Sequence, residues 1–254
     1  MRTKTDYIAV FDSGVGGISV LRQLRKLMPG ERFLYLGDSA NAPYGTRPTE
    51  EIRQLSLNVA EKLSQRGIKA LVVACNTATA AAIETLRQTY PDLIVVGIEP
   101  ALKPAADQFP GGTIGVLATP VTLKEEKFRQ LADHYAQHCT VVKLPAPGLS
   151  ELVEHGKADS PEAEALLRPL LEPWMGKLDA LVLGCTHYPF AAATIRRILG
   201  QEILLLDGGE GTARETKRRL AKADLLNEGE GLILIENSMD DPALLALSYK
   251  LLEE

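Results

Sequence analysis

The sequence predicts an α/β fold of two pseudo-symmetric, three-layer lobes, each built around a mainly parallel sheet. Two observations carry this prediction. Short apolar runs alternate with longer amphipathic stretches, and most runs lack polar alternation, as expected for parallel strands buried on both faces. The chain also repeats its own pattern, because Ala70–Thr77 aligns without a gap with Ala180–His187.

Nine apolar runs have the length and composition of strands. In chain order they are Tyr7–Phe11, Phe33–Leu36, Leu71–Ala74, Leu93–Val96, Thr113–Leu117, Thr140–Leu144, Leu181–Leu183, Ile203–Leu206 and Leu232–Ile235. The stretches between them are long enough for helices, so the chain predicts successive βαβ units with right-handed crossovers.

Helix start signals lie between the predicted strands. Thr122 with Glu125 forms a capping-box pattern, and Ser160–Pro161 places an N-cap residue before a first-turn proline. Pro48–Glu51 likewise supplies a cap and acidic first-turn residues, which predicts a helix over Ile52–Gln65.

The internal repeat predicts the domain organisation. Cys75 and Cys185 fall at the same point of the ungapped alignment, and a weaker similarity pairs Ile8–Ser13 with Ile114–Thr119. We therefore expect a duplication, with one lobe formed by residues 1–97 plus 208–254 and the other by residues 98–207. Open α/β sheets bind ligands beyond the carboxyl ends of their strands, so both cysteines are expected to face a cleft between the lobes.

Composition excludes several classes of protein. The 254 residues are 45% hydrophobic with a net charge of −5, which is unlike a disordered or fibrous chain and gives no basic footprint for nucleic acid. No apolar run approaches the ~20 residues of a membrane span, and the N-terminus lacks a signal-peptide profile. Three cysteines cannot form a disulfide framework, so we expect reduced thiols and a cytoplasmic protein.

The most informative residues are Cys75 and Cys185. Each follows an apolar strand and precedes polar residues that open a helix, where the helix dipole favours the thiolate. A redox pair is one interpretation, although the CxxC spacing is missing, and a metal site would need more ligands. A third interpretation is a paired acid and base on opposite faces of one carbon, with His187 and Asp12 assisting Cys185 and Cys75.

Two polar loops suit a small anionic ligand. Asp12–Gly17 is a glycine-rich turn between a strand and a helix that matches neither common nucleotide-binding pattern, and Gly37–Gly45 is a polar loop after the next strand. His134 and His138 beside Cys139 lack a fourth zinc ligand, so we interpret them as a solvated helix end and Cys139 as inert.

Together these stretches resemble the glutamate racemases of the aspartate/glutamate racemase superfamily. The matching segments are Phe11–Gly17, Leu36–Gly45, Val73–Ala78, Gly97–Pro100 and Leu183–Pro189. The resemblance implies two pseudo-symmetric lobes and a cofactor-independent, metal-free interconversion of L- and D-glutamate that supplies D-glutamate for peptidoglycan. We also expect a homodimer, and the charge and the short apolar runs argue against nucleic acid and membrane as partners.

The resemblance further implies roles for individual residues. Cys75 and Cys185 would be the two acid/base groups, with Cys75 acting on D-glutamate and Cys185 on L-glutamate. Asp12 and His187 would assist the thiols, and Glu154 matches a further assisting carboxylate. The substrate-binding residues would be Asp12, Ser13, Tyr44, Gly45, Asn76, Thr77, Thr186 and His187. Gly208–Gly209 departs from the family pattern, which usually has a serine there.

Three alternatives remain open at the level of the sequence. The length of the cleft cannot be read from the residues, so an aspartate racemase or a broad-specificity racemase fits the same motifs. Alternatives of another class are a non-catalytic amino-acid-binding module with the same two lobes and a thiol redox protein.

Overall fold

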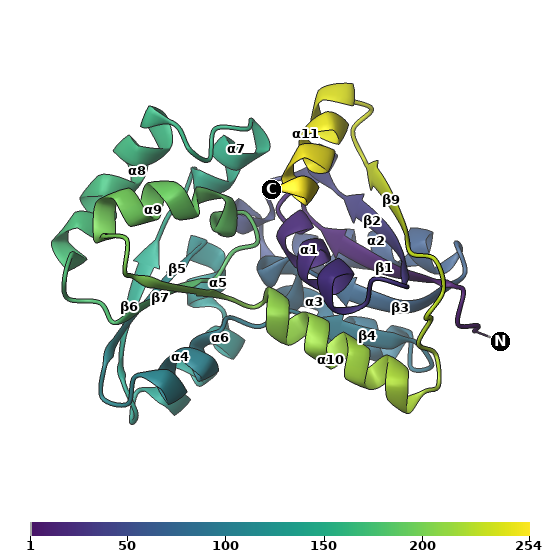
Figure 1. The fold of residues 1–254 in the computed structure, drawn as a ribbon. Helices are drawn as coiled ribbons and strands as arrows, with labels where there is room; N and C mark the ends of the chain where they lie inside the picture. The colour runs from purple at the N-terminus through teal and green to yellow at the C-terminus, as the bar shows by residue number, and fades with distance from the viewer. Residues whose placement is uncertain (1) are drawn as a thin grey trace. The chain divides into compact units, whose positions relative to one another are not determined.

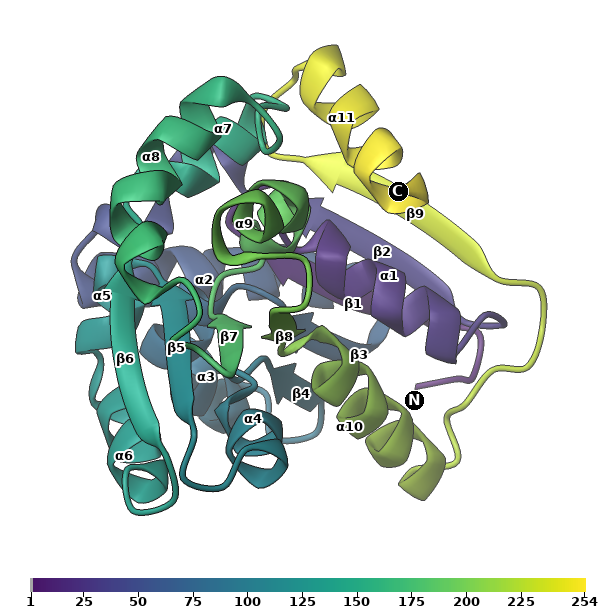
Figure 2. The same ribbon diagram turned by 60° about the vertical axis from the view of Figure 1, so that its left-hand side comes forward.

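The computed structural model describes residues 2–254, apart from the side chain of Lys127. The chain forms two compact units, one made of the residues up to Ile98 together with Gly209–Glu254, and one made of Glu99–Gly208. Each unit contains one sheet, and every strand pairing in the described chain is parallel. The predicted α/β class is therefore confirmed (Figures 1 and 2).

The first unit has a five-stranded sheet in the order β4-β3-β1-β2-β9. Its strands are β1 (Tyr7–Asp12), β2 (Arg32–Gly37), β3 (Ile68–Val73), β4 (Ile94–Gly97) and β9 (Leu232–Asn237). Its helices are α1 (Ile18–Leu27), η1 (Ser39–Asn41), η2 (Tyr44–Thr46), α2 (Thr49–Ser64), α3 (Asn76–Thr89), α10 (Gly209–Lys222) and α11 (Pro242–Glu253). Helices α1, α10 and α11 pack together on one face, and α2 packs with α3 on the other (Figure 1).

The second unit has a four-stranded sheet in the order β6-β5-β7-β8. Its strands are β5 (Thr113–Ala118), β6 (Thr140–Pro145), β7 (Ala180–Leu183) and β8 (Leu204–Asp207). Its helices are α4 (Leu102–Gln108), α5 (Pro120–Lys124), α6 (Glu126–Tyr135), α7 (Leu149–Glu154), α8 (Pro161–Leu171), η3 (Glu172–Trp174), η4 (Tyr188–Ala191) and α9 (Ala192–Leu199).

Alternate strand residues of the second unit enter two separate hydrophobic cores. Leu181 and Leu183 of β7 pack with α7, α8 and α9, whereas Ala180 and Val182 pack with α4 and α6. Both faces of the sheet are thus covered, which is why these strands lack polar alternation. The unit has the three layers that the sequence predicts.

The two units share a strand order and hydrogen bonds at equivalent strand ends. Strands β4-β3-β1-β2 correspond to β8-β7-β5-β6. Ala74 N–H donates to Phe11 O in the first unit, as Gly184 N–H donates to Leu117 O in the second. This register makes Ala118 the counterpart of Asp12, and it places Cys75 and Cys185 one residue beyond equivalent bonds. The structural repeat therefore extends the repeat in the sequence.

Helix starts differ from the predictions at two places. The capping box at Thr122 and Glu125 is wrong, because Thr119 is the N-cap of α5 and its hydroxyl accepts from Thr122 N at 3.2 Å. Pro120 fixes the helix start immediately after Thr119. The helix expected from Ile52 begins at Thr49, so Thr49 lies inside α2 and is not its cap.

Other local predictions are confirmed. Ser160 caps α8 by accepting from Ala163 N at 3.2 Å, with Pro161 in the first turn. All nine predicted strands are present among the described residues, although β3 begins at Ile68, three residues before the expected start.

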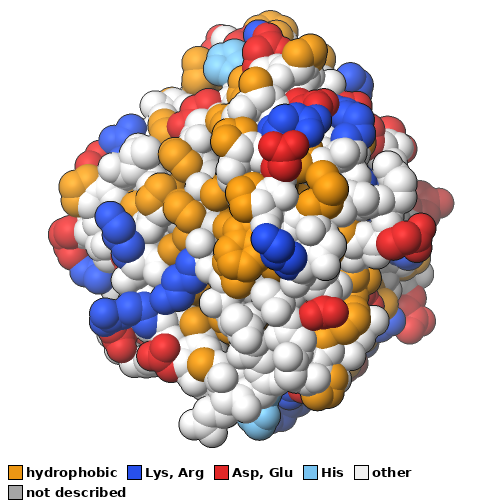
Figure 3. Space-filling model, turned by 90° about the vertical axis from the view of Figure 1, so that its left-hand side faces the viewer, with side chains coloured by type: hydrophobic (Ala, Val, Ile, Leu, Met, Phe, Trp, Pro, Cys, Tyr) orange, Lys and Arg blue, Asp and Glu red, His pale blue; other side chains and the backbone are white. Residues whose placement is uncertain are grey.

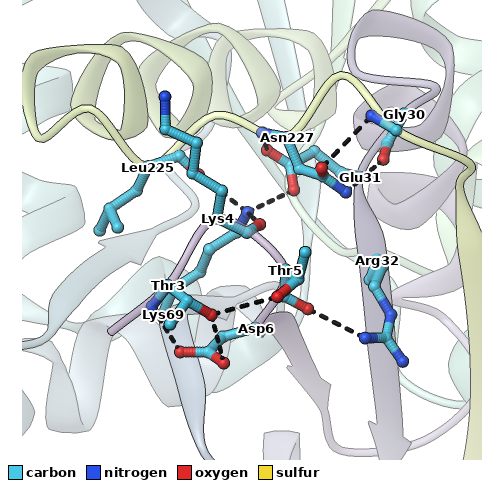
Figure 4. Close-up of polar contacts among 11 residues, drawn as sticks. Thr3, Lys4, Thr5, Asp6, Gly30, Glu31, Arg32, Lys69, Leu225 and Asn227 are labelled. Carbon is cyan, nitrogen blue, oxygen red and sulfur yellow. Dashed lines mark hydrogen bonds and ion pairs between the residues drawn. The ribbon is translucent and has the colours of Figure 1, made fainter. Parts of the chain in front are cut away.

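A buried charge pair ties distant segments of the first unit together at the amino-terminal ends of its strands (Figure 4). Lys69 of β3 and Glu31 at the entry to β2 have fully buried side chains, and Lys69 Nζ lies 2.5 Å from Glu31 Oε2. Lys69 Nζ also donates to Lys4 O and Leu225 O, and Glu31 Oε1 accepts from Asn227 N at 2.8 Å. The segment after α10 is thereby fixed against β2 and β3.

The surface carries both signs of charge. On the face drawn in Figure 3, apolar side chains are interspersed with lysine, arginine, aspartate and glutamate side chains. No described helix combines the length and the apolar composition that a membrane crossing requires.

Candidate active-site residues

Cys75 lies at the junction of β3 and α3 in the first unit. It is the N-cap of α3, where its sulfur accepts from Ala78 N at 3.4 Å, and its thiol donates to Ser13 Oγ at 3.6 Å. The residue is only 5% exposed. A sulfur at a helix N-terminus receives backbone N–H groups and the positive end of the helix dipole, both of which favour the thiolate.

Asp12 ends β1 and begins the glycine-rich turn that enters α1. Its side chain is fully buried, and Oδ1 accepts from Gly14 N at 3.0 Å. A Cβ atom on Gly17 would lie 2.6 Å from the Asp12 Cβ, so this turn requires glycine to pass so close to the carboxylate. The turn thus holds Asp12 and Ser13 at the carboxyl end of the sheet.

The loop after β2 places Tyr44 in the same region. Its hydroxyl donates to Asp38 Oδ2 at 2.7 Å, and Asn41 Nδ2 also donates to Asp38. Burial, the bond to Asp38 and the charges of Cys75 and Asp12 raise the pKa of Tyr44, so this hydroxyl stays protonated. Gly45 lies beside it in η2 and is half-buried.

Asp38 is a residue that the sequence analysis did not single out. Its carboxylate is buried and receives the loop side chains Asn41 and Tyr44. It directly follows β2, one residue beyond the Gly37 that pairs with Asp12 of β1, and this place at the carboxyl end of a strand was the signal that could have identified it.

Asn76 and Thr77 form the first turn of α3 and are both buried. The Asn76 Oδ1 atom accepts no hydrogen bond from any described residue. A buried acceptor without a donor costs free energy, so a ligand with an N–H or O–H group is the natural partner for this atom.

Cys185 occupies the equivalent position after β7 in the second unit. Its sulfur lies 3.6 Å from His187 Nδ1, and His187 Nε2 lies 2.6 Å from Glu154 Oε1. The His187 and Glu154 side chains are 6% and 14% exposed. Thr186 between the two reactive side chains is also buried.

The chain of contacts from Cys185 to Glu154 determines the charge of His187. Burial lowers the pKa of the imidazole, but the hydrogen bonds and charges of Cys185 and Glu154 outweigh it and hold the pKa of His187 well above its usual value. The raised pKa favours the imidazolium form of the ring. This form can stabilise a thiolate at Cys185 and hold a proton beside it.

The structure groups the predicted site residues within each unit. In the first unit it brings together Cys75, Ser13, Asp12 and Tyr44, and in the second it brings Glu154 to His187 across 33 residues of sequence. Cys139 lies directly before β6 and packs in the core with α4 and α6, whereas Cys185 packs in the other core of the unit; burial raises the pKa of the Cys139 thiol. Among the described residues, no group of three or more His, Cys, Asp and Glu side chains is arranged to hold a metal ion.

Comparisons with known proteins give a consistent result. The sequence model of the Asp/Glu/Hydantoin racemase family matches residues 18–216. A glutamate racemase of Clostridium perfringens is 47% identical over 249 residues, covering 97% of this chain and 96% of that protein.

Solved structures agree with the sequence comparison. The glutamate racemase of Thermus thermophilus, in complex with β-chloro-D-alanine, has a TM-score of 0.83 and 38% identity over 98% of this chain and 94% of that one. The Escherichia coli glutamate racemase, in complex with L-glutamate and the activator UDP-MurNAc-Ala, has a TM-score of 0.86 and 30% identity over 99% and 96%. The chain therefore belongs to the Asp/Glu racemase family of isomerases and groups with its glutamate racemases.

Proposed function

We propose that this protein interconverts L- and D-glutamate without a cofactor, using Cys75 and Cys185 as the two acid/base groups. The observation that carries the proposal is their equivalent placement, each one residue beyond matching hydrogen bonds at the carboxyl ends of β3 and β7. The L-glutamate complex of the E. coli relative supports the choice of substrate.

The proposed reaction has two proton transfers. In the L-to-D direction the Cys185 thiolate removes the α-proton, and the electron pair of the C–H bond remains on a carbanion. The Cys75 thiol then gives its proton to the opposite face of the same carbon and becomes a thiolate. The D-to-L direction uses the thiols in reverse, so no oxidant or reductant is consumed.

The supporting groups of the two thiols have different chemistry. His187, held by Glu154, supplies positive charge beside Cys185, while Asp12, Ser13 and the α3 N-terminus surround Cys75. Asn76, Thr77 and Thr186 would bind the substrate together with Ser13, Tyr44 and Gly45. The Asn76 Oδ1 atom, which accepts no hydrogen bond within the described part of the chain, suits the substrate ammonium group. Preorganised donors of this kind would stabilise the charge of the carbanion.

In the cell, we infer, the product D-glutamate supplies peptidoglycan synthesis. This role assigns the protein to the cytoplasm, where glutamate is available, and we expect it to act as a homodimer.

One experiment separates this proposal from its alternatives. L-Glutamate and L-aspartate are incubated separately with the protein in deuterated water without added cofactor, and optical rotation and α-deuteration are followed. Glutamate should racemise and exchange its α-proton. Inversion of aspartate alone would identify an aspartate racemase, and exchange with neither amino acid would reject a racemase.

Cysteine variants test the mechanism. Cys75→Ala and Cys185→Ala should each abolish inversion, whereas Cys139→Ala, the matched control at the third cysteine, should retain it. Inversion by both active-site variants would rule out the two-thiol mechanism. A reversible Cys75–Cys185 disulfide that activity requires would instead indicate a redox protein.

A further inference from the structure

Each unit contains a fully buried tyrosine whose hydroxyl bonds a backbone carbonyl beside a reactive group. In the second unit, Tyr188 OH donates to Ala146 O at 2.8 Å. In the first unit, Tyr35 OH donates to Gly14 O at 2.5 Å. Neither tyrosine is among the residues to which the proposed reaction assigns a role.

Tyr188 connects the cysteine segment to the helix that carries Glu154. Tyr188 N–H donates to Cys185 O at 3.1 Å, so its backbone belongs to the turn that holds the thiol. Ala146 lies after β6 at the start of the loop that leads to α7, and Glu154 is the last residue of α7. Ala146, Leu149, Cys185 and Tyr188 share one hydrophobic core.

The Tyr188 hydroxyl therefore spans two segments that must stay in register for the Glu154–His187 bond to form. That bond is 2.6 Å long, and a carboxylate that moved by an ångström would no longer hold the imidazolium. Burial and the charges of Cys185 and Glu151 raise the pKa of Tyr188, so the hydroxyl remains a donor throughout the working pH range.

Tyr35 makes an analogous bond in the first unit, although it lies on β2 and not in the turn that follows the cysteine. It projects from β2 to the carbonyl of Gly14, and the Gly14 N–H donates to Asp12 Oδ1. The neighbouring Ser13 accepts from the Cys75 thiol. The Tyr35 hydroxyl thus restrains the turn that holds both supports of Cys75.

We propose that Tyr188 is a positioning residue for the Cys185 proton transfer and that Tyr35 is the corresponding positioning residue for Cys75. This inference rests on the proposed two-thiol function. Neither hydroxyl needs to touch the substrate. Each sets the geometry of one half of the reaction through the loop that it holds.

The test uses Tyr188→Phe and Tyr35→Phe, which remove one oxygen each, with the exposed Tyr249→Phe as control. Initial rates are measured in ordinary water with L- and D-glutamate carrying deuterium or hydrogen on the α-carbon. We expect each buried variant to lose roughly tenfold to hundredfold in kcat/KM.

The isotope effects distinguish positioning from a general loss of structure. In Tyr188→Phe the Cys185 transfer becomes the slow step, so the deuterium effect on kcat/KM should rise with L-glutamate and fall with D-glutamate. In Tyr35→Phe the pattern should be reversed. Partial unfolding would lower both rates and leave both isotope effects as in the wild type.

The outcomes separate this inference from the proposed function. If both variants show the isotope effects of the wild type, the positioning roles are overturned. Racemisation of glutamate by the wild type would still support the proposed function. Failure of the wild type to racemise glutamate would remove the function itself. If one Phe variant does not fold, the Phe variant of the other tyrosine still tests the predicted direction of change.

Discussion

Removing the positive charge from the buried pair of the first unit should destabilise the protein strongly. In Lys69→Met, the Glu31 carboxylate keeps the Asn227 N–H but loses its cation in a site with no solvent exposure. Lys4 O and Leu225 O also lose their donor. Breaking one partner of a fully buried pair costs about 3–5 kcal/mol. For a chain of this size each kcal/mol lowers Tm by about 2–4 °C, so a fall of about 10 °C is expected.

The assay is urea and thermal unfolding followed by circular dichroism, with two comparison variants. Lys4→Met makes the same substitution at the exposed Lys4–Asp224 pair and should change the midpoint little. In Lys69→Met/Glu31→Gln the unpaired charge is gone while an amide oxygen remains for Asn227 N–H, so part of the loss should be recovered. A loss below about 1 kcal/mol in Lys69→Met, or a double variant less stable than Lys69→Met, would refute the reasoning.

Three further variants probe the site and one helix. Cys185 and Glu154 together hold the pKa of His187 high, and Glu154→Gln removes one of these two charges. The reaction should therefore lose roughly tenfold or more in kcat/KM, and the pKa of His187 followed by imidazole NMR should fall. Because the pKa of His187 is raised on folding, its contribution to wild-type stability should be complete below about pH 6.5 and lost as pH rises through the folded-state pKa. Urea unfolding across pH measures this contribution, and Glu154→Gln should make it smaller. Asn76→Ala should raise KM about tenfold with little change in Tm, because its Oδ1 has no partner among the described residues to lose on substitution. Ser160→Ala should cost about 1 kcal/mol of stability with unchanged kcat, since it removes the cap of α8 and a hydrogen bond to the exposed Glu162 carboxylate.

Patterns that depend on neighbouring residues were readable from the sequence. The uninterrupted apolar runs at Leu181–Leu183 and Leu71–Ala74 identified buried parallel strands, because both faces of each strand require apolar side chains. The aligned Cys75 and Cys185 identified equivalent strand ends, because each cysteine follows one of these apolar runs. The start of α5 was also present in the sequence, since Thr119–Pro120 has the form of the correctly predicted Ser160–Pro161.

Contacts between distant segments could not be obtained in this way. The bond between Glu154 and His187 depends on how α7 packs beside the turn after β7, and no local pattern encodes that packing. The role of Asp38 could not be predicted either, because a carboxylate in a polar loop is expected to be solvated. Its hydrogen bonds from Tyr44 and Asn41 depend on how the loop folds. The burial of Lys69 also has no sequence signal, since its partner Glu31 is 38 residues away.

The two equivalent strand ends carry unequal supports, and this difference has a measurable consequence. Asp12 of the first unit corresponds to Ala118 of the second, and His187 of the second unit aligns with Thr77 of the first. One proposed transfer is thus assisted by an imidazolium and the other by a carboxylate and a helix N-terminus.

Since L- and D-glutamate have equal free energy in water, kcat/KM must be the same in both directions whatever the supports are. The barriers of the two proton transfers are under no such constraint, because different groups stabilise them. Wild-type protein should therefore show different deuterium isotope effects on kcat/KM with α-deuterated L- and D-glutamate, and the larger effect identifies the thiol with the higher barrier. Ala118→Asp, which places a carboxylate at the equivalent strand end, should change the ratio of the two effects. Equal effects in the wild type, unchanged by Ala118→Asp, would mean that these supports do not set the barriers.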